Sequence, residues 1–434
     1  EEMVFTANQS FALYPNLSGG ACMCIYNAGS EEQKQTYLEK IYSGEWTGTM
    51  CLTEPHAGTD LGIIKTKAVP NQDGSYNITG TKIFITAGEH DLADNIIHLV
   101  LAKTPDAPAG SKGISLFIVP KFHVNADGSL GERNAVSCGS IEHKMGIKAS
   151  ATCVMNFDGA KGFMVGAENT GLASMFIMMN YERLTMGLQG IGGAELAYQN
   201  ATAYTLDRIQ GRADSGIQEP NKAADPIVFH ADVRRMLLNA KTISEASRCF
   251  AMYVAKELDT NKYTDDAEAR KAADDRVALL TPVAKAFLTD RGLEASIDAQ
   301  QCFGGHGYIR EWGMEQIVRD TRISQIYEGT NGIQSLDLLG RKVVKNGGAF
   351  VTTYVQEMRD FANNMNADHA IKQAILTSAD KLEDLTKAVV AAAAVNKDEI
   401  NGCAVDYLQA FGYVSFAYMF GLMVEAANGK EGDF

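Results

Sequence analysis

Apolar residues recur at helical spacing in the first part of the chain. In SEEQKQTYLEKIYSGE, Ser30 is a typical helix N-cap, acidic residues fill the first turn, and Gly44 marks the end. The apolar residues between them lie three and four positions apart. Residues 1 to about 48 are therefore predicted to be helical.

The pattern changes to short alternating runs from about residue 50 to 165. GSYNITGTKIFIT, IIHLVLAKT, GISLFIVPKF and TCVMNFDG are β-rich and are separated by Asp-Gly, Pro and Gly turns. Several strands with no helix between them are typical of an antiparallel barrel or sandwich.

Helical spacing returns at about residue 168 and continues, after NGGAF, to the end of the chain. The predicted fold is therefore mainly α with a β-barrel middle domain. We predict four parts: the end of an N-terminal helical domain (1–48), the β-barrel domain (49–167), a helical bundle (168–346) and a C-terminal helical extension (347–434).

Composition narrows the classes of partner. The 434 residues are 46% hydrophobic and 21% charged, which is ordinary for a globular protein, and the net charge is −14. No basic run is present, which argues against nucleic acid or an anionic membrane as partner. The most apolar stretch, from Phe411, contains about a dozen apolar residues before Glu425 and suits a buried helix better than a membrane span.

The eight cysteines form no CxxC pair and the eight histidines no metal-binding spacing, so we expect no metal site. Reduced, buried thiols point to a cytosol or matrix, and we predict a cytoplasmic location. The chain begins at Glu1 within a helix-rich region, so we expect a fragment of a longer protein.

Two stretches of the β-region are candidates for a ligand loop. MCLTEPHAGTDLG, residues 50 to 62, follows a strand and exposes backbone and small side chains, which suits a flat polar heterocycle. KIFITAGEHD places Phe84 beside a hydroxyl at a strand end. By spacing alone, an ordinary loop and an ordinary core-and-turn pattern are the favoured interpretations.

Three helical stretches carry further candidates. QQCFGGHGYIRE has glycines that let backbone approach a phosphate, although a helix C-cap explains them equally well. In YERL, the favoured interpretation of Glu182 and Arg183 is a solvated ion pair. In LDRIQGR, Arg208 and Arg212 either offset a helix dipole or bind an anion.

Glu328 is the last candidate, in RDTRISQIYEGTNGIQSLDLLGRK. It is either a cap for the helix that follows or a base at the edge of an apolar cavity, where desolvation raises its proton affinity. Spacing alone does not separate these alternatives.

Taken together, LTEPHAGTD, KIFIT, QCFGGHGY and RDTRISQIYEGT, in this order, resemble the acyl-CoA dehydrogenase family of flavoproteins over about residues 1–345. Its fold of helical domain, β-barrel and helical bundle agrees with the predicted order, although the family has a larger N-terminal helical domain. The extension after residue 345 is similar to that of a branch that includes the 3-methylmercaptopropionyl-CoA dehydrogenases.

The resemblance implies FAD-dependent α,β-dehydrogenation of an acyl-CoA to the trans-2-enoyl-CoA. Glu328 matches the base that removes the α-proton while flavin N5 accepts the β-hydride. Its backbone N–H and the flavin ribityl chain would hold the thioester carbonyl. Thr59, Arg183, Tyr327 and Gly329 match positions near the substrate.

The resemblance also implies a set of FAD contacts, of which those of Gln301 to Gly305 come from the neighbouring subunit. The matching positions are Met50, Cys51, Leu52, Thr53, Gly58, Thr59, Phe84, Ile85, Thr86, Arg208, Gln210, Gln301, Cys302, Phe303, Gly304, Gly305, Thr330, Asn331 and Gly332.

Three positions depart from the common family pattern. Most members have Trp at Phe84 and Ser at Thr59, and a few place their base on the helix that holds Glu182. Because Glu328 is present, we assign the base there and treat Glu182 as backup or structural.

The implied partners are a short or medium acyl-CoA, 3-methylmercaptopropionyl-CoA among the candidates, and electron-transfer flavoprotein as acceptor. A homodimer or tetramer is expected. An acyl-CoA oxidase would share the fold and the base. A non-catalytic binding relative would be expected to show a basic face or to lack Glu328.

Overall fold

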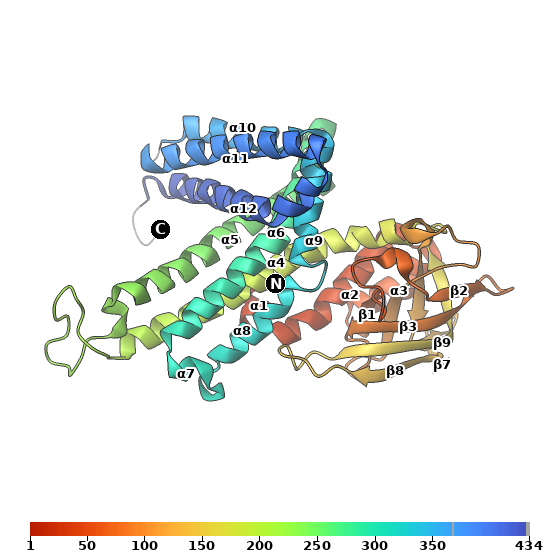
Figure 1. Cartoon of the computed structure of the whole chain (residues 1–434). Helices are drawn as coiled ribbons and strands as arrows, with labels where there is room; N and C mark the ends of the chain where they lie inside the picture. Colours follow the sequence, from red (N-terminus) through yellow and green to blue (C-terminus); the bar gives the residue numbers. More distant parts are fainter. Residues whose placement is uncertain (367–368, 431–434) are drawn as a thin grey trace. The chain divides into compact units, whose positions relative to one another are not determined.

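The computed structural model describes residues 1–366 and 369–430, and the chain divides into two compact units (Figure 1). The N-terminal unit comprises residues 8–182. The C-terminal unit comprises residues 1–7 and 183–434.

Two helices open the N-terminal unit, α2 (Gln9–Ala28) and α3 (Glu31–Tyr42). The prediction that Ser30 caps α3 is confirmed, since its hydroxyl accepts from the backbone N–H of Gln33 and the Gln33 side chain bonds back to the backbone N–H of Ser30. Helix α2 packs closely on the first strand, where a Cβ on Gly48 would lie 2.4 Å from the Cβ of Ala21.

A seven-stranded sheet fills the rest of this unit, with a separate two-stranded hairpin. The strand order is β1-β4-β5-β9-β3-β2, with β8 also paired to β9; β1 and β4 are parallel and the other pairs antiparallel. The β-rich middle domain is confirmed, but the sheet is open, not a closed barrel. The strands are β1 (Trp46–Cys51), β2 (Lys67–Pro70), β3 (Tyr76–Thr86), β4 (Asn95–Ala102), β5 (Ser115–Pro120), β6 (Phe122–Val124), β7 (Leu130–Arg133), β8 (Val136–Ile141) and β9 (Thr152–Val165), with short 3-10 turns at Leu61–Ile63 and Gly110–Gly113.

Strand β4, which lies between β1 and β5, is buried on both faces. Leu99 and Leu101 point into a core shared with α2 and α3, while Val100 and Ala102 point into a second core formed with β3, β8 and β9. Because side chains alternate along a strand, one continuous apolar run serves both cores.

The C-terminal unit is helical. The long helix α4 (Gly171–Asp207) begins in the N-terminal unit and ends in this one. The other helices are α1 (Glu2–Ala7), α5 (Ala231–Tyr263), α6 (Ala267–Cys302), α7 (Gly305–Tyr308), α8 (Met314–Arg322), α9 (Asn331–Leu336), α10 (Ala349–Asn364), α11 (His369–Val395) and α12 (Asp398–Ala427), with the π-helix η6 (Asp337–Val343) and 3-10 turns at Ile227–Phe229, Arg310–Trp312, Ile323–Gln325 and Val344–Asn346.

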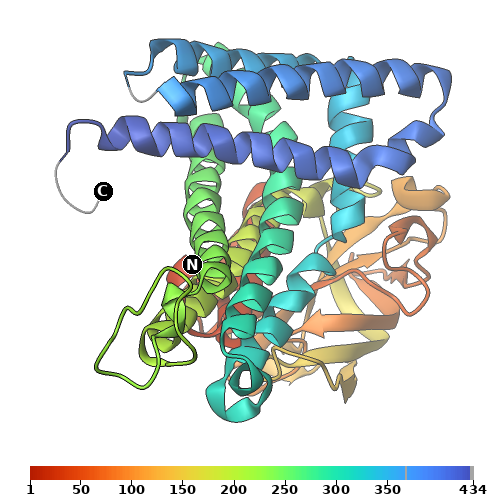
Figure 2. The ribbon, with the colours of Figure 1, turned by 60° about the vertical axis from the view of Figure 1, so that its left-hand side comes forward.

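Helices α10, α11 and α12 lie together and run across α5 and α6 (Figure 2). Their shared core includes Phe287 of α6 and Tyr354 of α10, and Tyr354 stacks on Phe411 of α12. At Gly412 the contact between α12 and α6 is so close that a Cβ would lie 2.3 Å from the Phe287 ring.

By length and composition α12 is the one helix in the described part of the chain that could cross a membrane. Its residues Tyr407, Leu408, Phe411 and Met419 are buried among the other helices of this unit. That burial is typical of a core helix, which passes the same test.

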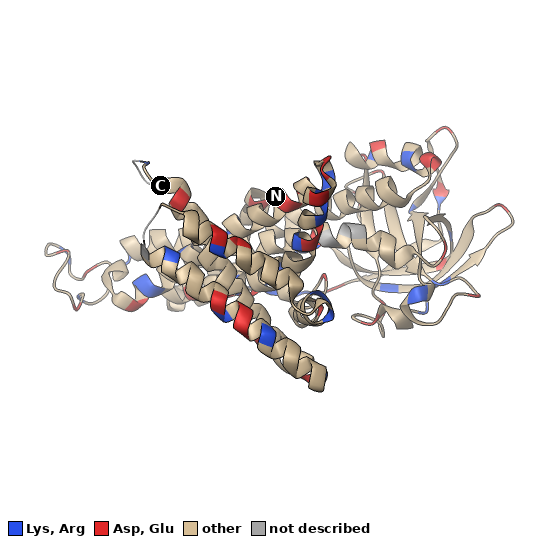
Figure 3. Cartoon of the chain, turned by 90° about the horizontal axis from the view of Figure 1, so that it is seen from above, with Lys and Arg blue, Asp and Glu red and all other residues tan. Residues whose placement is uncertain are grey.

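Acidic and basic residues are mixed along the C-terminal helices (Figure 3). Arg359 of α10 pairs with both Asp380 and Glu383 of α11, at 2.6 and 2.9 Å. This part of the surface therefore carries both signs of charge.

Candidate active site

The loop after β1 and the end of β3 lie side by side in the N-terminal unit. The backbone N–H of Ile83 donates to the carbonyl oxygen of Thr53 at 2.9 Å. The structure therefore brings together two of the stretches predicted to contact the flavin, the loop from Leu52 to Thr59 and the strand end at Phe84.

Glu54 anchors the loop from Leu52 to Thr59 through its buried hydrogen bonds. Its carboxylate is buried and accepts bonds from the backbone N–H groups of Lys65 and Thr66, from the Thr66 hydroxyl at 2.6 Å, and from the Lys82 ammonium at 2.9 Å. Lys82 is fully buried on β3 and also donates to the Leu52 carbonyl. Although burial opposes it, Lys82 and these hydrogen bonds lower the pKa of Glu54 and favour its carboxylate form.

Phe84 is exposed at this site and has an unusual backbone. Its φ is +60°, at an irregularity of β3 between Lys82 and Ile85, and the residue is 61% exposed. A bulky residue in the left-handed region is strained, and such strain concentrates at functional sites. The chain therefore presents an aromatic face where the sequence predicts a flavin contact.

The other residues of this unit that were predicted to contact FAD fall into a buried group and an exposed group. The side chains of Met50, Cys51 and Ile85 are buried in the two cores of this unit and are not open to a ligand. Gly58 and Thr59 are exposed, and Leu52, Thr53 and Thr86 are partly exposed.

The QCFGG segment ends α6 in the C-terminal unit. Cys302 and Phe303 are buried, and Phe303 stacks on Tyr204 with ring centroids 4.0 Å apart. Gln301, Gly304 and Gly305 remain exposed, and a Cβ on either glycine would meet no atom within 4 Å. Burial of Cys302 and Phe303 fixes the position of this turn. The exposed glycines leave the backbone of the turn accessible.

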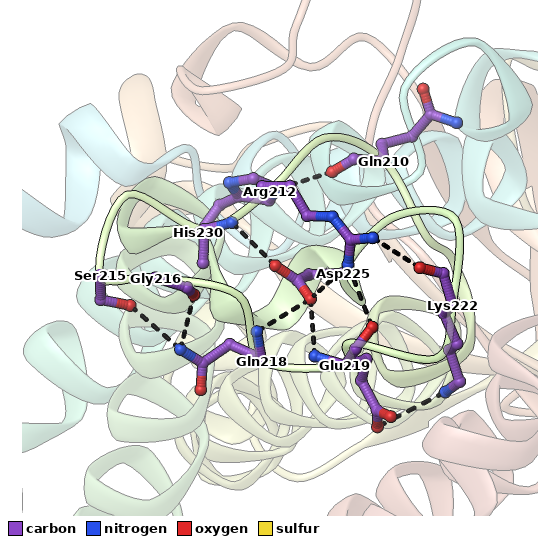
Figure 4. A network of polar contacts seen from close by, with 10 residues as sticks. Gln210, Arg212, Ser215, Gly216, Gln218, Glu219, Lys222, Asp225 and His230 are labelled. Atoms are coloured by element: carbon purple, nitrogen blue, oxygen red, sulfur yellow. Dashed lines mark hydrogen bonds and ion pairs between the residues drawn. The ribbon is translucent and has the colours of Figure 1, made fainter.

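The predicted contacts Arg208 and Gln210 are exposed on the loop between α4 and α5, which Asp225 organises (Figure 4). The buried Asp225 carboxylate accepts from the backbone N–H groups of Ala213, Gln218 and Glu219 and from Arg212. Burial opposes ionisation, but these bonds outweigh it and lower the pKa of Asp225 to about 2.

We expect Asp225→Asn to loosen this loop, because an amide cannot accept all four of these bonds. A carboxyl whose pKa is lowered by folding stabilises the folded form above its unfolded pKa of about 3.9. That contribution is lost as the pH falls through the folded value of about 2. Hydrogen exchange, corrected for its intrinsic pH dependence, should show weaker protection of residues 213–219 in the variant.

Asp214→Asn is the matched control, since Asp214 is exposed on the same loop. It should leave the protection unchanged. Equal protection in wild type and Asp225→Asn from pH 6 to pH 3 would contradict the role of Asp225.

Glu328 lies in the C-terminal unit, on a turn just before α9. Its φ is +54° and that of Gly329 is +84°, and a Cβ on Gly329 would lie 2.5 Å from the Gln334 amide nitrogen. The N-cap of α9 is Thr330, whose hydroxyl accepts from the backbone N–H of Ile333. The alternative that Glu328 caps this helix is therefore wrong.

The electrostatic surroundings of Glu328 suit a base. Burial raises the pKa of its carboxyl above the ordinary range, and the positive charges of Lys285 and Arg183 offset part of that rise. Among the described residues, neither cation forms an ion pair with it; Arg183 lies 3.6 Å from Asp337 instead. The Glu328 backbone N–H also has no partner in the described part of the chain, so it is free to donate to a ligand oxygen.

The neighbours of Glu328 hold the turn in place. Tyr327 donates its hydroxyl to Gln189 of α4, and Gln334 donates to the Glu328 carbonyl at 3.3 Å. Asn331 points inward onto α6, while Gly332 is open, with no atom within 4 Å of a Cβ position. The Asn331 side chain is therefore occupied within the chain.

Glu182 is a fully buried carboxylate of the N-terminal unit. It accepts a hydrogen bond from the Asn16 amide of α2 at 2.6 Å. This bond joins α4 to α2 and indicates a structural role. Across residues 1–366 and 369–430, no group of histidines, cysteines and carboxylates could hold a metal ion.

Four charged residues of these sites were missed by sequence reasoning: Glu54, Lys82, Asp225 and Lys285. Glu54 and Lys82 both stand inside quoted stretches, Glu54 as an acidic residue between a threonine and a proline, but nothing in either stretch predicted their contact. The partners of Glu54 lie 11 to 28 positions away, beyond what a local pattern reveals.

Four family models match the chain. They are the N-terminal (1–45), middle (49–160) and C-terminal (169–343) domains of acyl-CoA dehydrogenase and an acetyl-CoA dehydrogenase C-terminal-like domain (354–434).

Curated relatives carry dehydrogenase names. The chain is 42% identical to 3-methylmercaptopropionyl-CoA dehydrogenase of Ruegeria pomeroyi over 99% of this chain and 73% of that protein. It is also 42% identical to a butyryl-CoA dehydrogenase of Syntrophomonas wolfei, over 83% of this chain and 60% of that protein. The chain thus spans between three fifths and three quarters of the length of these relatives.

Solved structures share the fold. ACDH-11 of Caenorhabditis elegans, in complex with C11-CoA, aligns with a TM-score of 0.80 at 20% identity, covering 96% of this chain and 68% of that one. An acyl-CoA dehydrogenase of Bacillus anthracis complexed with FAD gives 0.75 at 24% identity, covering 94% and 68%. The predicted fold class and enzyme class are confirmed, and the chain belongs to the acyl-CoA dehydrogenase family.

Proposed function

We propose that this chain dehydrogenates an acyl-CoA thioester to the trans-2-enoyl-CoA, with Glu328 as the base that removes the α-proton. The observation that carries the proposal is the Glu328 turn. Its carboxylate has a raised pKa, it does not cap α9, and its backbone N–H has no partner among the described residues.

The two functional groups of Glu328 would act on groups attached to adjacent carbons of the thioester, the carbonyl oxygen and the α-proton. The N–H donates to the carbonyl oxygen and so stabilises the negative charge that develops there as the α-proton leaves. The carboxylate takes that proton, and its raised pKa brings its proton affinity nearer the operating pH. The inward contacts of Tyr327 and Asn331 hold both groups in place.

The residues present fit FAD. Gly58, Gly304, Gly305 and Gly332 leave open space where a Cβ would lie, so backbone can approach a flat ring or a phosphate. Phe84 offers an exposed aromatic face beside the loop that Glu54 holds. Each unit by itself thus offers contacts of the kind FAD needs, with Arg208, Gln210 and Gln301 in the C-terminal unit, and the cofactor would supply the acceptor for the β-hydride.

We assign 3-methylmercaptopropionyl-CoA as the first substrate to examine, on the strength of the relative from Ruegeria pomeroyi. Electron-transfer flavoprotein as acceptor, a homodimer or tetramer, and a cytoplasmic location belong to the same proposal.

The test is an anaerobic titration of the flavin absorption band with acyl-CoA thioesters. We expect 3-methylmercaptopropionyl-CoA or butyryl-CoA to bleach the band at lower concentration than a long-chain thioester. Rapid reoxidation of the bleached protein by air, with release of peroxide, would favour an oxidase. A yellow protein that no thioester bleaches would contradict the proposal.

A further inference from the structure

Lys285 of α6 is a buried ammonium without an ionic partner. None of its side chain surface is exposed, and in the described part of the chain it forms no ion pair. Its Nζ donates to the Asn331 side-chain oxygen at 2.7 Å. Burying a cation that has no ionic partner destabilises the folded protein. We therefore expect Lys285 to have a function that offsets this cost.

Asn331 ties Lys285 to the turn that carries Glu328. Its side-chain NH2 donates to Asp290 at 2.6 Å, to Thr289 at 3.0 Å and to the Ala286 carbonyl at 3.1 Å. These donor contacts fix the amide orientation, so its oxygen faces Lys285. Asn331 is only three positions after Glu328, and the intervening turn contains two left-handed residues that depend on such anchoring.

The other charged groups near Glu328 already have partners. Asp290 of α6 accepts from Asn331, Gln325 and Gln409, all at 2.6 to 2.7 Å. Arg183 of α4 faces Asp337 of η6, which also pairs with Arg341. Lys285 is the remaining cation whose charge acts on Glu328 without an ion pair of its own.

We propose that Lys285 is a positioning residue for the base: its buried ammonium, held by Asn331, keeps the Glu328 side chain ionised and its turn in place. This inference rests on the proposed function of Glu328. Burial lowers the pKa of Lys285 to about 7, against the opposing effects of Glu328 and Asp290, so its charge is present below neutral pH and is lost above it.

The test replaces Lys285 by Gln, which keeps a donor for Asn331 but removes the charge, and by Met, which removes both. Infrared spectroscopy of each variant follows the protonated-carboxyl band that Glu328→Gln abolishes. We expect this titration to move to higher pH in both variants. In the pH profile of kcat/KM, the acid limb should move the same way, with a loss of up to about tenfold at pH 7.

Lys241→Gln is the control, because Lys241 is an exposed lysine on α5 paired with Glu245 at 2.8 Å. Its Glu328 titration should match wild type. An unchanged or lower titration in Lys285→Gln would overturn the inference. If neither variant folds, the same measurement on Asn331→Ala, which removes the acceptor that holds the Lys285 ammonium, replaces it, and a Glu328 titration that does not move there overturns the inference.

The infrared readout needs neither flavin nor substrate. Normal activity in Glu328→Gln would defeat the proposed function, while an unmoved carboxyl band in Lys285→Gln would defeat only this inference.

Discussion

Glu328→Gln should slow flavin reduction by a saturating acyl-CoA by about 10²- to 10⁴-fold, the usual contribution of a general base. The amide has nearly the same shape but cannot accept the α-proton. Because the backbone N–H of residue 328 is kept, the affinity for acyl-CoA should change little. Stopped-flow bleaching of the flavin band gives the rate, and the flavin content of the purified variant confirms that the cofactor is retained.

Glu182→Gln is the matched control, a carboxylate-to-amide change at a second buried position. Its side-chain oxygen can still accept the bond from Asn16, so the folded variant should bleach at nearly the wild-type rate. The reverse result, a slow Glu182→Gln and a normal Glu328→Gln, would move the base to α4.

Glu54→Ala should destabilise the protein by about 3–5 kcal/mol, because it leaves the buried Lys82 amino group without its carboxylate partner. It also removes the acceptor for the N–H groups of Lys65 and Thr66, so the loop from Leu52 to Thr59 loses its anchor. Chemical denaturation measures the stability, and the flavin absorbance per chain measures the effect on the loop.

The double variant Glu54→Leu with Lys82→Met separates the two effects. It removes both charges, so it should recover much of the stability that Glu54→Ala loses. Flavin content should stay low, because the loop amides still have no acceptor. Wild-type stability in Glu54→Ala would show that Lys82 finds another partner, and the proposed anchor would be wrong.

The features that could be predicted from the sequence are those set by neighbouring residues, such as the ends of a helix and the positions of β-rich runs. Ser30 and Gly44 bound α3 as expected, and the four quoted β-rich runs fall on β3, β4, β5 and the first part of β9. The pairing of the strands could not be predicted in this way, because it depends on residues far apart in the chain. The parallel alignment of β1 with β4 has no local signal.

The same distinction applies to the site. Glu328 was found through its motif, and Thr330 as the true cap follows from the preference of helices for a hydroxyl at that position. The buried lysines Lys82 and Lys285 were missed, since each looks like an ordinary strand or helix residue until its partner is placed beside it. Their roles are tertiary, as are the three backbone donors to Asp225.

The close contact between Gly412 and Phe287 bears on how the C-terminal helices can be exchanged between proteins. Gly412 of α12 has no side chain, and the Phe287 ring of α6 occupies the space that a side chain there would need. A chimera that grafts α10–α12 onto a shorter relative must therefore carry the residue at position 287 with it. Among natural sequences, these two positions should covary, with a larger residue at 412 accompanied by a smaller one at 287.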